Sequence, residues 1–292
     1  MAWKELRFPL NALNAESVEA ELEELGALAV TFEDAADEAL LEPAPGEQPL
    51  WTRTLVRALF DAAIDVEAVA PALWKRIDVP APAFEVVAIV DRQWETAWRR
   101  GFGPMRFGRR LWICPHGAAP PVDDAIIVRL EPGLAFGTGT HPTTALCLEW
   151  LDAMPLAGKT VVDYGSGSGV LAIAAAKLGA ARVYAVDHDP QALIATRDNA
   201  AANDVSACIR ISPPEALGDG IRADFLVANI LARPLIETSG RFAALVPAGG
   251  RLALSGILHS QCPELVAAYA FGFIMDDPVL RDDWALLAGL RK

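Results

Sequence analysis

Cysteines are few and widely spaced in this chain. Its 292 residues contain four, and none forms a C-x-x-C pair: Cys114, Cys147, Cys208 and Cys262. This spacing is neither that of a zinc site nor the dense framework of a small secreted domain. We therefore expect reduced thiols in a protein that holds no metal.

Long hydrophobic runs are also missing. The chain begins with Lys4 and Glu5 close to its first residue, and no apolar signal region surrounds them. No uninterrupted apolar run approaches the roughly 20 residues that a membrane span requires. These absences predict a cytoplasmic protein that does not enter a membrane.

Positively charged residues are outnumbered: the chain has 25 Lys and Arg and 38 Asp and Glu, which gives a net charge of −13. Such a surface repels nucleic-acid phosphates, so we expect no stable nucleic-acid binding and a basic partner instead. Much of the acidity lies between residues 16 and 47, where it forms either a solvated helix face or a docking surface. The exception is residues 92–110, where arginines alternate with aromatic residues and could meet RNA, a substrate or a neighbouring domain.

The length favours two domains, and the first ninety residues form a recognisable pattern. Hydrophobic periodicity predicts strands at 3–8, 27–32, 54–60 and 84–90, and helices at 15–25 and 66–77. This β-α-β-β-α-β order is that of a ferredoxin-like α+β domain. We take residues 1–90 as this domain and the basic segment 91–103 as a helical linker.

Residues 104–292 read as an α/β domain. From Thr160 onward, strands and helices alternate regularly, with strands at 182–187, 208–211, 224–229 and 251–256, and helices including 231–245. Residues 106–114 read as one strand, and two closing strands near 273–280 and 284–290 suggest an antiparallel hairpin. The order predicts a doubly wound sheet of the class I methyltransferase type.

The most informative motif is the glycine-rich run between the first strand of this alternation and the next helix. Asp163, Gly165, Gly167 and Gly169 give D-x-G-x-G-x-G, whereas a dinucleotide fingerprint needs glycine at the place of Val170. The spacing therefore favours S-adenosylmethionine over NAD. Without Cβ atoms, the turn lets the methionine end of the cofactor approach backbone N–H groups at the helix start.

A carboxylate follows the second strand of the alternation. Asp187 at this strand tip can accept hydrogen bonds from both ribose hydroxyls of the cofactor. The alternative is a tight turn in which an aspartate before Pro190 only caps the next helix.

Asn229 ends the strand 224–229, at the edge where open α/β sheets bind ligands. Its amide oxygen could hold a substrate amine, which makes Asn229 the candidate catalytic residue. In methyltransferases that act on nitrogen, an Asn-Pro-Pro-aromatic motif occupies this place, and Asn229-Ile230-Leu231-Ala232 shares only its first residue. Capping of the following helix is the alternative for Asn229.

A second glycine-rich stretch runs from Leu130 to Thr144. It lacks the lysine of a phosphate-binding loop, which excludes nucleoside triphosphate binding by that motif. We expect a flap over the cofactor, with Phe136 as its lid and Thr144 within reach of the ligand; a plain connection capped by Thr140 or Thr143 is the alternative. A single His141 is not assigned as a base.

These motifs resemble those of the bacterial ribosomal protein L11 methyltransferase family over nearly the whole chain. The resemblance lies in residues 105–108, 111–115, 133–144, 163–169 and 229–232. It implies S-adenosylmethionine-dependent trimethylation of lysine side chains and of the N-terminal α-amine of protein L11, with the ferredoxin-like domain recognising that substrate. The cofactor positions that it implies are Thr144, Gly165, Asp187 and Asn229.

Other functions remain open from the sequence. Asn229 and the arginine-rich segment also suit a nucleic-acid N-methyltransferase, against which the acidity counts. A non-catalytic ribosome-assembly protein and an NAD-dependent enzyme are weaker alternatives, given the intact motifs. A monomer is expected because no unpaired apolar helix stripe is evident.

Overall fold

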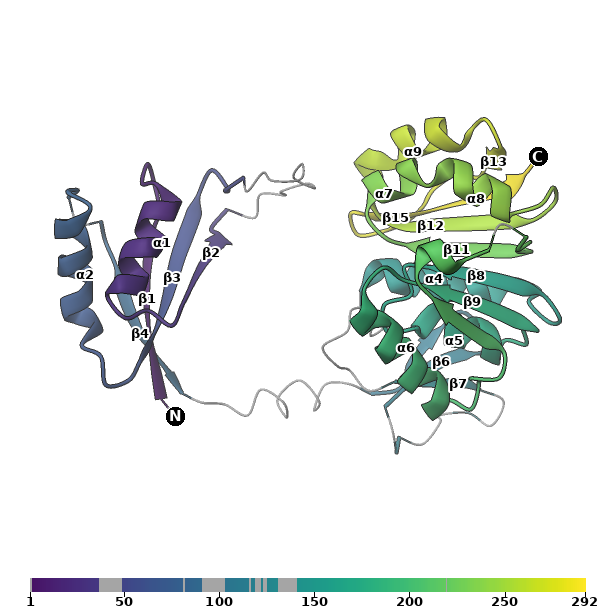
Figure 1. Cartoon of the computed structure of the whole chain (residues 1–292), viewed down its shortest axis with the longest axis horizontal. Coiled ribbons are helices and arrows are strands. Elements are labelled where there is room, and N and C mark those ends of the chain that lie inside the picture. The colour runs from purple at the N-terminus through teal and green to yellow at the C-terminus, as the bar shows by residue number, and fades with distance from the viewer. Residues whose placement is uncertain are drawn as a thin grey trace. The chain divides into compact units, whose positions relative to one another are not determined.

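The computed structural model describes residues 2–36, 49–80, 82–90, 103–115, 117–118, 122, 125–130, 141–218 and 220–292. The chain divides into two compact units, Met1–Ala97 and Trp98–Lys292 (Figure 1). The expected helical linker 91–103 lies outside the described residues, apart from Gly103. The flap residues 131–140, including Phe136, also lie outside them.

The N-terminal unit has one sheet and two helices. Its elements are β1 (Ala2–Pro9), α1 (Ala15–Glu24), β2 (Ala29–Asp34), β3 (Thr54–Asp61), α2 (Val66–Arg76) and β4 (Glu85–Val90). The strands lie in the order β2-β3-β1-β4, and every neighbouring pair is antiparallel. This is the ferredoxin-like arrangement, so the predicted fold class of the unit is confirmed.

Period-two alternation in β1 and β3 builds the core of this unit. Leu6 and Phe8 of β1 are buried with Phe60 of β3 against Leu22 of α1 and Trp74 of α2. The Phe8 and Trp74 rings meet edge to face, with centroids 4.6 Å apart. Both helices therefore pack on the same face of the sheet, and the other face carries the remaining side chains of each strand.

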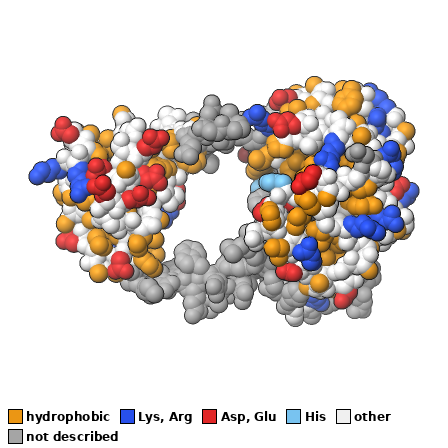
Figure 2. All heavy atoms as spheres, in the orientation of Figure 1, with side chains coloured by type: hydrophobic (Ala, Val, Ile, Leu, Met, Phe, Trp, Pro, Cys, Tyr) orange, Lys and Arg blue, Asp and Glu red, His pale blue; other side chains and the backbone are white. Residues whose placement is uncertain are grey.

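The acidic residues of the N-terminal unit gather over its helices in Figure 2. Glu16, Glu23 and Glu24 of α1 are exposed, whereas Val18 and Leu22 on the opposite side of this helix are buried. The described acidic residues of the run thus include an exposed face of α1, which fits both a solvated helix face and a docking surface.

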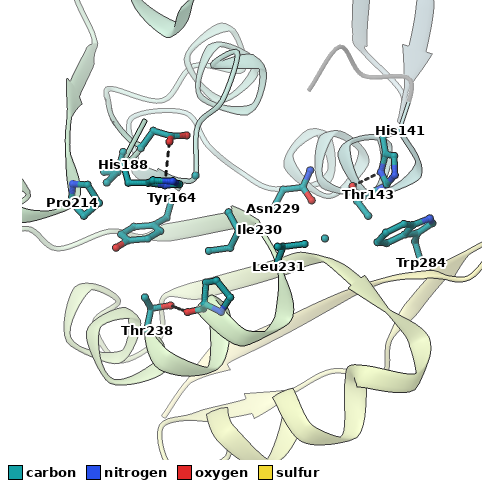
Figure 3. Close-up of a pocket in the computed structure, with 15 residues that line it drawn as sticks. His141, Thr143, Tyr164, His188, Pro214, Asn229, Ile230, Leu231, Thr238 and Trp284 are labelled. Carbon is teal, nitrogen blue, oxygen red and sulfur yellow. Dashed lines mark hydrogen bonds and ion pairs between the residues drawn. The ribbon is translucent and has the colours of Figure 1, made fainter. Parts of the chain in front are cut away.

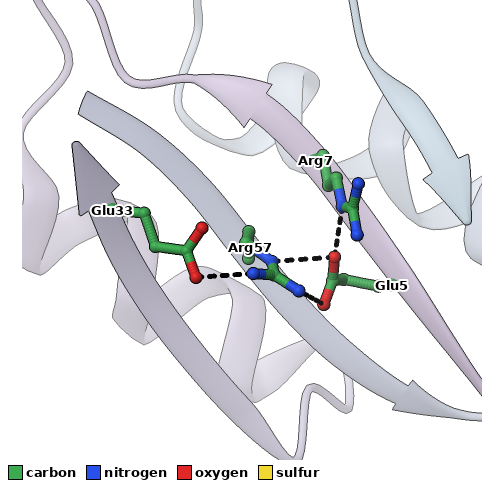
Figure 4. Close-up of polar contacts among 4 residues, drawn as sticks. All are labelled: Glu5, Arg7, Glu33 and Arg57. Atoms are coloured by element: carbon green, nitrogen blue, oxygen red, sulfur yellow. Dashed lines mark hydrogen bonds and ion pairs between the residues drawn. The ribbon is translucent and has the colours of Figure 1, made fainter. Parts of the chain in front are cut away.

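The face of the sheet away from the helices carries a charged cluster (Figure 4). Arg57 of β3 donates from Nη2 to Glu5 Oε2 at 2.8 Å and from Nε to Glu5 Oε1 at 2.9 Å. Arg57 also pairs with Glu33 of β2, and Arg7 pairs with Glu5. Burial alone raises the pKa of Glu5, but hydrogen bonds and charge from Arg57 and Arg7 outweigh it and lower this pKa.

The C-terminal unit begins with a small sheet of β5 (Met105–Phe107), β6 (Leu111–Cys114) and β7 (Ile126–Arg129). The larger sheet has eight strands, and its path is β10-β9-β8-β11-β12-β15-β13, with β14 paired to β15. The strands are β8 (Thr160–Tyr164), β9 (Arg182–Val186), β10 (Ile209–Ser212), β11 (Phe225–Asn229), β12 (Arg251–Leu258), β13 (Phe273–Met275), β14 (Val279–Arg281) and β15 (Trp284–Arg291). The helices are α4 (Pro142–Ala153), α5 (Val170–Lys177), α6 (Pro190–Ala202), α7 (Ala232–Glu237), α8 (Ser239–Leu245) and α9 (Cys262–Tyr269).

Strands β8 to β12 run parallel to one another, whereas β15 is antiparallel to β12 and β13. Leu148 of α4 and Ile173 of α5 belong to a core on one face, whereas Leu235 of α7, Phe242 of α8 and Leu265 of α9 belong to a core on the other. A parallel sheet covered on both faces needs apolar side chains along its strands, as this sequence supplies. The doubly wound class I methyltransferase fold that the sequence predicts is confirmed.

Three predicted elements are divided in the structure. The strand expected near 273–280 is present as β13 and β14, each of which pairs with β15. The strand expected at 106–114 is a hairpin, because Gly108 has a φ of +68° and Asp152 accepts the Arg109 N–H at 2.6 Å. The helix expected at 231–245 is broken into α7 and α8 at Thr238, whose hydroxyl donates to the Pro234 carbonyl at 2.7 Å. The bond of the Thr238 hydroxyl to its own helix is local, whereas the turn at Gly108 is held by Asp152 from the distant helix α4.

The expected cysteine chemistry matches the structure, since all four are free thiols and only Cys208 is not fully buried. Among the described residues, no group of His, Cys, Asp or Glu is arranged to hold a metal ion. No helix in the described part of the chain is long and apolar enough to cross a membrane.

Candidate functional site

The glycine run forms the turn between β8 and α5. Gly165, Gly167 and Gly169 have φ angles of +87°, +53° and +80°, a conformation that side chains with a Cβ rarely adopt. A Cβ on Gly165 would lie 2.2 Å from Ile230 Cγ2, so this position has room only for glycine. The predicted turn before the helix is therefore present, with α5 beginning directly after Gly169.

Asp163 lies beneath this turn and is fully buried. Its Oδ2 accepts the Ala172 N–H of α5 at 2.9 Å, while Oδ1 has no hydrogen-bond partner among the described residues. Burial raises the pKa of Asp163 from 3.8 to about 8, against the opposing effect of the Ala172 bond and with a further contribution from Asp187. Burial thus favours the neutral form of this carboxyl group, and its bond to Ala172 joins β8 to α5.

Asp187 follows β9 and reaches across to the glycine turn. Its Oδ2 accepts the Gly167 N–H at 2.8 Å, and its Oδ1 accepts the Asp189 N–H at 3.0 Å. Asp189, not Asp187, caps helix α6 by accepting the Gln191 N–H at 2.9 Å. Each Asp187 oxygen can accept a second hydrogen bond, so the carboxylate supports the turn and can still bind two hydroxyl groups.

Asn229 at the end of β11 contacts the start of α4. Its Nδ2 donates to Thr144 Oγ1 at 3.2 Å, and its Oδ1 is buried without a hydrogen-bond partner in the described part of the chain. Helix α7 begins later, after Leu231, and no side chain caps it, so Asn229 does not serve as its cap. A buried amide oxygen without a donor costs free energy, which points to a ligand that donates a hydrogen bond there.

These residues surround a cavity of about 610 Å³ at the carboxyl edge of the large sheet (Figure 3). Of the predicted site residues, Gly165, Asp187 and Asn229 line the cavity directly. Thr144 and Gly167 lie behind the lining and hold Asn229 and Asp187 in place through the hydrogen bonds above. The structure therefore brings together five of the predicted site residues, which come from four separate segments of the chain.

The lining also includes residues that sequence reasoning missed. They are Tyr164, Val186, His188, Pro214, Ile230, Leu231, Pro234, Thr238, Gly256 and Trp284. Pro214 comes shortly after β10, so the rule that ligands bind at the carboxyl ends of parallel strands could have identified it. Because β15 is antiparallel to β12, its first residue, Trp284, lies at the same edge of the sheet as the carboxyl ends of the parallel strands.

His141 forms another part of the lining, as the N-cap of α4. Its Nδ1 lies 2.7 Å from Thr143 Oγ1, and its ring meets the Trp284 ring with centroids 4.7 Å apart. Burial lowers the pKa of His141, which keeps the imidazole neutral at pH 7. These contacts support a structural role for His141 at the start of α4.

The cavity fits a nucleoside that carries a charged amino-acid chain. It offers a carboxylate for ribose hydroxyls, a glycine turn at a helix start and mostly apolar walls. The Asp187 carboxylate beside the glycine turn is the observation that favours such an occupant, and the Asn229 oxygen, which has no partner among the described residues, is left for a further donor.

Comparison with known proteins agrees with this geometry. Residues 2–292 match the model of the family described as ribosomal protein L11 methyltransferase (PrmA). A relative of that name from Nitrosococcus oceani is 48% identical with full coverage of both chains, and one from Alkalilimnicola ehrlichii is 52% identical over 94% of each. A crystal structure of ribosomal protein L11 methylase from Lactobacillus delbrueckii subsp. bulgaricus has a TM-score of 0.60 and 35% identity, covering 65% of this chain and all of that one. The resemblance inferred from the motifs is thus confirmed, and the chain belongs to the ribosomal protein L11 methyltransferase family.

Proposed function

We propose that this protein methylates ribosomal protein L11, using S-adenosylmethionine to modify lysine side chains and the N-terminal α-amine. The substrate is the one named in relatives that match the whole chain. The observation that carries the proposal is the Asn229 side chain, which lines the cavity and whose oxygen has no hydrogen-bond partner among the described residues. An amine is the kind of donor that this oxygen needs.

The cofactor-binding roles are assigned to the residues predicted from the motifs. Asp187 accepts hydrogen bonds from the two ribose hydroxyls. Gly165 and Gly167 let the methionine end of the cofactor approach the start of α5. When bound, S-adenosylmethionine supplies a methyl group that passes to the amine lone pair while the S–C electron pair stays on sulfur. Thr144 positions Asn229 by accepting a hydrogen bond from its amide. The role of Phe136 as a lid stays a prediction.

The harder task for this chain is to present a neutral amine. At pH 7, neutralising a free lysine of pKa about 10.4 costs roughly 4.6 kcal/mol, and an α-amine of pKa about 8 costs roughly 1.4 kcal/mol. The apolar walls around Ile230 and Leu231 favour the neutral form, which lowers this cost. The Asn229 oxygen accepts one N–H and directs the lone pair toward the methyl group.

The remaining expectations concern partners. We propose that the N-terminal unit recognises L11, that the protein works as a monomer in the cytoplasm, and that it forms no stable complex with nucleic acid. The acidic composition supports a basic protein partner, because the net charge is −13.

The test is mass spectrometry of unmodified L11 after incubation with the protein and S-adenosylmethionine, with free RNA and assembled ribosomal subunits as parallel substrates. Mass gains in multiples of a methyl group on L11 are expected. Methyl groups found only on RNA would favour the nucleic-acid N-methyltransferase, and cofactor binding without any transfer would favour a non-catalytic binding protein.

Asn229→Ala separates the catalytic role from a structural one. We expect turnover to fall about a hundredfold, because the amine is no longer oriented, while the cofactor Kd changes much less. Turnover is measured by the mass assay and Kd by calorimetry. Unchanged turnover would rule out the proposed role of Asn229.

A further inference from the structure

The cavity has two ends on either side of Asn229. In Figure 3, His188, Pro214 and Tyr164 lie toward one end, and Thr143, His141 and Trp284 lie toward the other. Asp187 and its neighbour His188 belong to the first end, which is the ribose end under the proposed function. The second end is left for the group that receives the methyl.

An aromatic corner forms this second end. Trp284 is half-buried at the start of β15, and its ring meets His141 at 4.7 Å with an interplanar angle of 70°. The His141 ring is held in turn by Thr143 in the first turn of α4. The corner is therefore built from two elements far apart in sequence, α4 and β15.

The surroundings of the corner suit an amine that progressively loses its N–H groups. Leu231 lines the cavity although 56% of it is exposed, and Ile230 lies beside it. Each methyl added to nitrogen removes one hydrogen-bond donor, so apolar and aromatic surface must take over from hydrogen bonding. A neutral imidazole at His141 adds no repulsion toward an ammonium group.

Two acidic residues directly precede the aromatic corner in sequence. Asp282 and Asp283 come before Trp284, and both are exposed in the turn between β14 and β15. Negative charge in this turn attracts a cationic amine from solution.

We propose that Trp284 and His141 form the amine subsite, in which the Trp284 ring binds mono- and dimethylated amines so that further methyl groups are added, each after the methylated ammonium has lost a proton to water. This inference rests on the proposed function. It assigns Trp284 to substrate specificity and separates it from cofactor binding.

The test compares Trp284→Leu, which removes the aromatic ring, with Trp284→Phe, which retains one. Phe271→Leu is the matched control, because Phe271 is 62% exposed and does not line the cavity. Each variant is incubated with L11 and S-adenosylmethionine, and the mono-, di- and trimethylated products are quantified at equal total methylation. We expect Trp284→Leu to lower the trimethylated fraction by roughly fivefold, and Trp284→Phe and the control to retain it.

A second measurement locates Trp284 relative to the cofactor. Calorimetry with S-adenosylhomocysteine should give the same Kd for Trp284→Leu and the wild type, and thermal unfolding checks that the variants fold. A weakened Kd with an unchanged product distribution would place Trp284 at the cofactor end and overturn the inference. An unchanged distribution with an unchanged Kd would also overturn it, whereas a wild-type protein that does not methylate L11 would contradict the proposed function itself.

Discussion

The open face of the N-terminal sheet and the carboxyl edge of the C-terminal sheet both bury carboxyl groups, but the pKa values of these groups shift in opposite directions. Glu5 in the first is held by two arginines, and its pKa is lowered. Asp163 in the second has one oxygen without a partner among the described residues, and its pKa is raised to about 8. The paired charges stabilise the open face of a sheet, whereas the Asn229 oxygen at the cavity has no hydrogen-bond partner in the described part of the chain, so a ligand can still bond there.

The largest expected effect in this comparison comes from Asp187→Ala. We expect the affinity for S-adenosylmethionine to fall about a hundredfold or more, because two charge-assisted hydrogen bonds are lost and the Gly167 N–H loses its acceptor. Isothermal calorimetry measures the change. Asp198→Asn on the exposed side of α6 is the control, and an unaltered Kd for Asp187→Ala would show that the ribose is bound elsewhere.

Glu5→Gln should destabilise the N-terminal unit by about 1–3 kcal/mol at pH 7, since Arg57 and Arg7 lose a charged partner. The folded pKa lies below 4.5, so Glu5 stabilises above about pH 4.5, and this contribution disappears as the pH falls through the folded value. Hydrogen exchange of peptides from β1 and β3 at a series of pH values measures both effects. Glu24→Gln on the exposed face of α1 should leave this pH dependence intact, and a parallel change in both variants would argue against a specific role for Glu5.

The smallest effect at neutral pH is expected for Asp163→Asn. The stability contributed by Asp163 depends on pH in the opposite direction to that contributed by Glu5. The wild-type carboxyl contributes full stability below pH 3.8, and this contribution is lost as the pH rises toward about 8. An amide does not ionise, so the variant should lose less stability between pH 6 and 9. Thermal unfolding of the protein without cofactor tests this, and an identical pH slope in variant and wild type would contradict the raised pKa.

The sequence predicted much of the fold because hydrophobic periodicity and turn residues agree in most segments. The split β-α-β-β-α-β order and the alternation after Thr160 are clear in the pattern, and Asp187 and Asn229 were found because they end strands that are parallel. The break at Thr238 could not be predicted, since it depends on a hydroxyl that bonds to the Pro234 carbonyl inside an otherwise helical run. Trp284 was missed because its place in the site depends on the direction of β15, which no local pattern gives.

The position of β15 in the large sheet has a consequence for biosynthesis. This strand lies between β12 and β13, although β13 comes before it in the chain. During translation, β13 and β14 are made before the strand to which they pair, so this side of the sheet closes only after residues 284–291 have left the ribosome. Trp284 then reaches His141 late, and a nascent chain lacks this wall of the cavity until its final strand is in place.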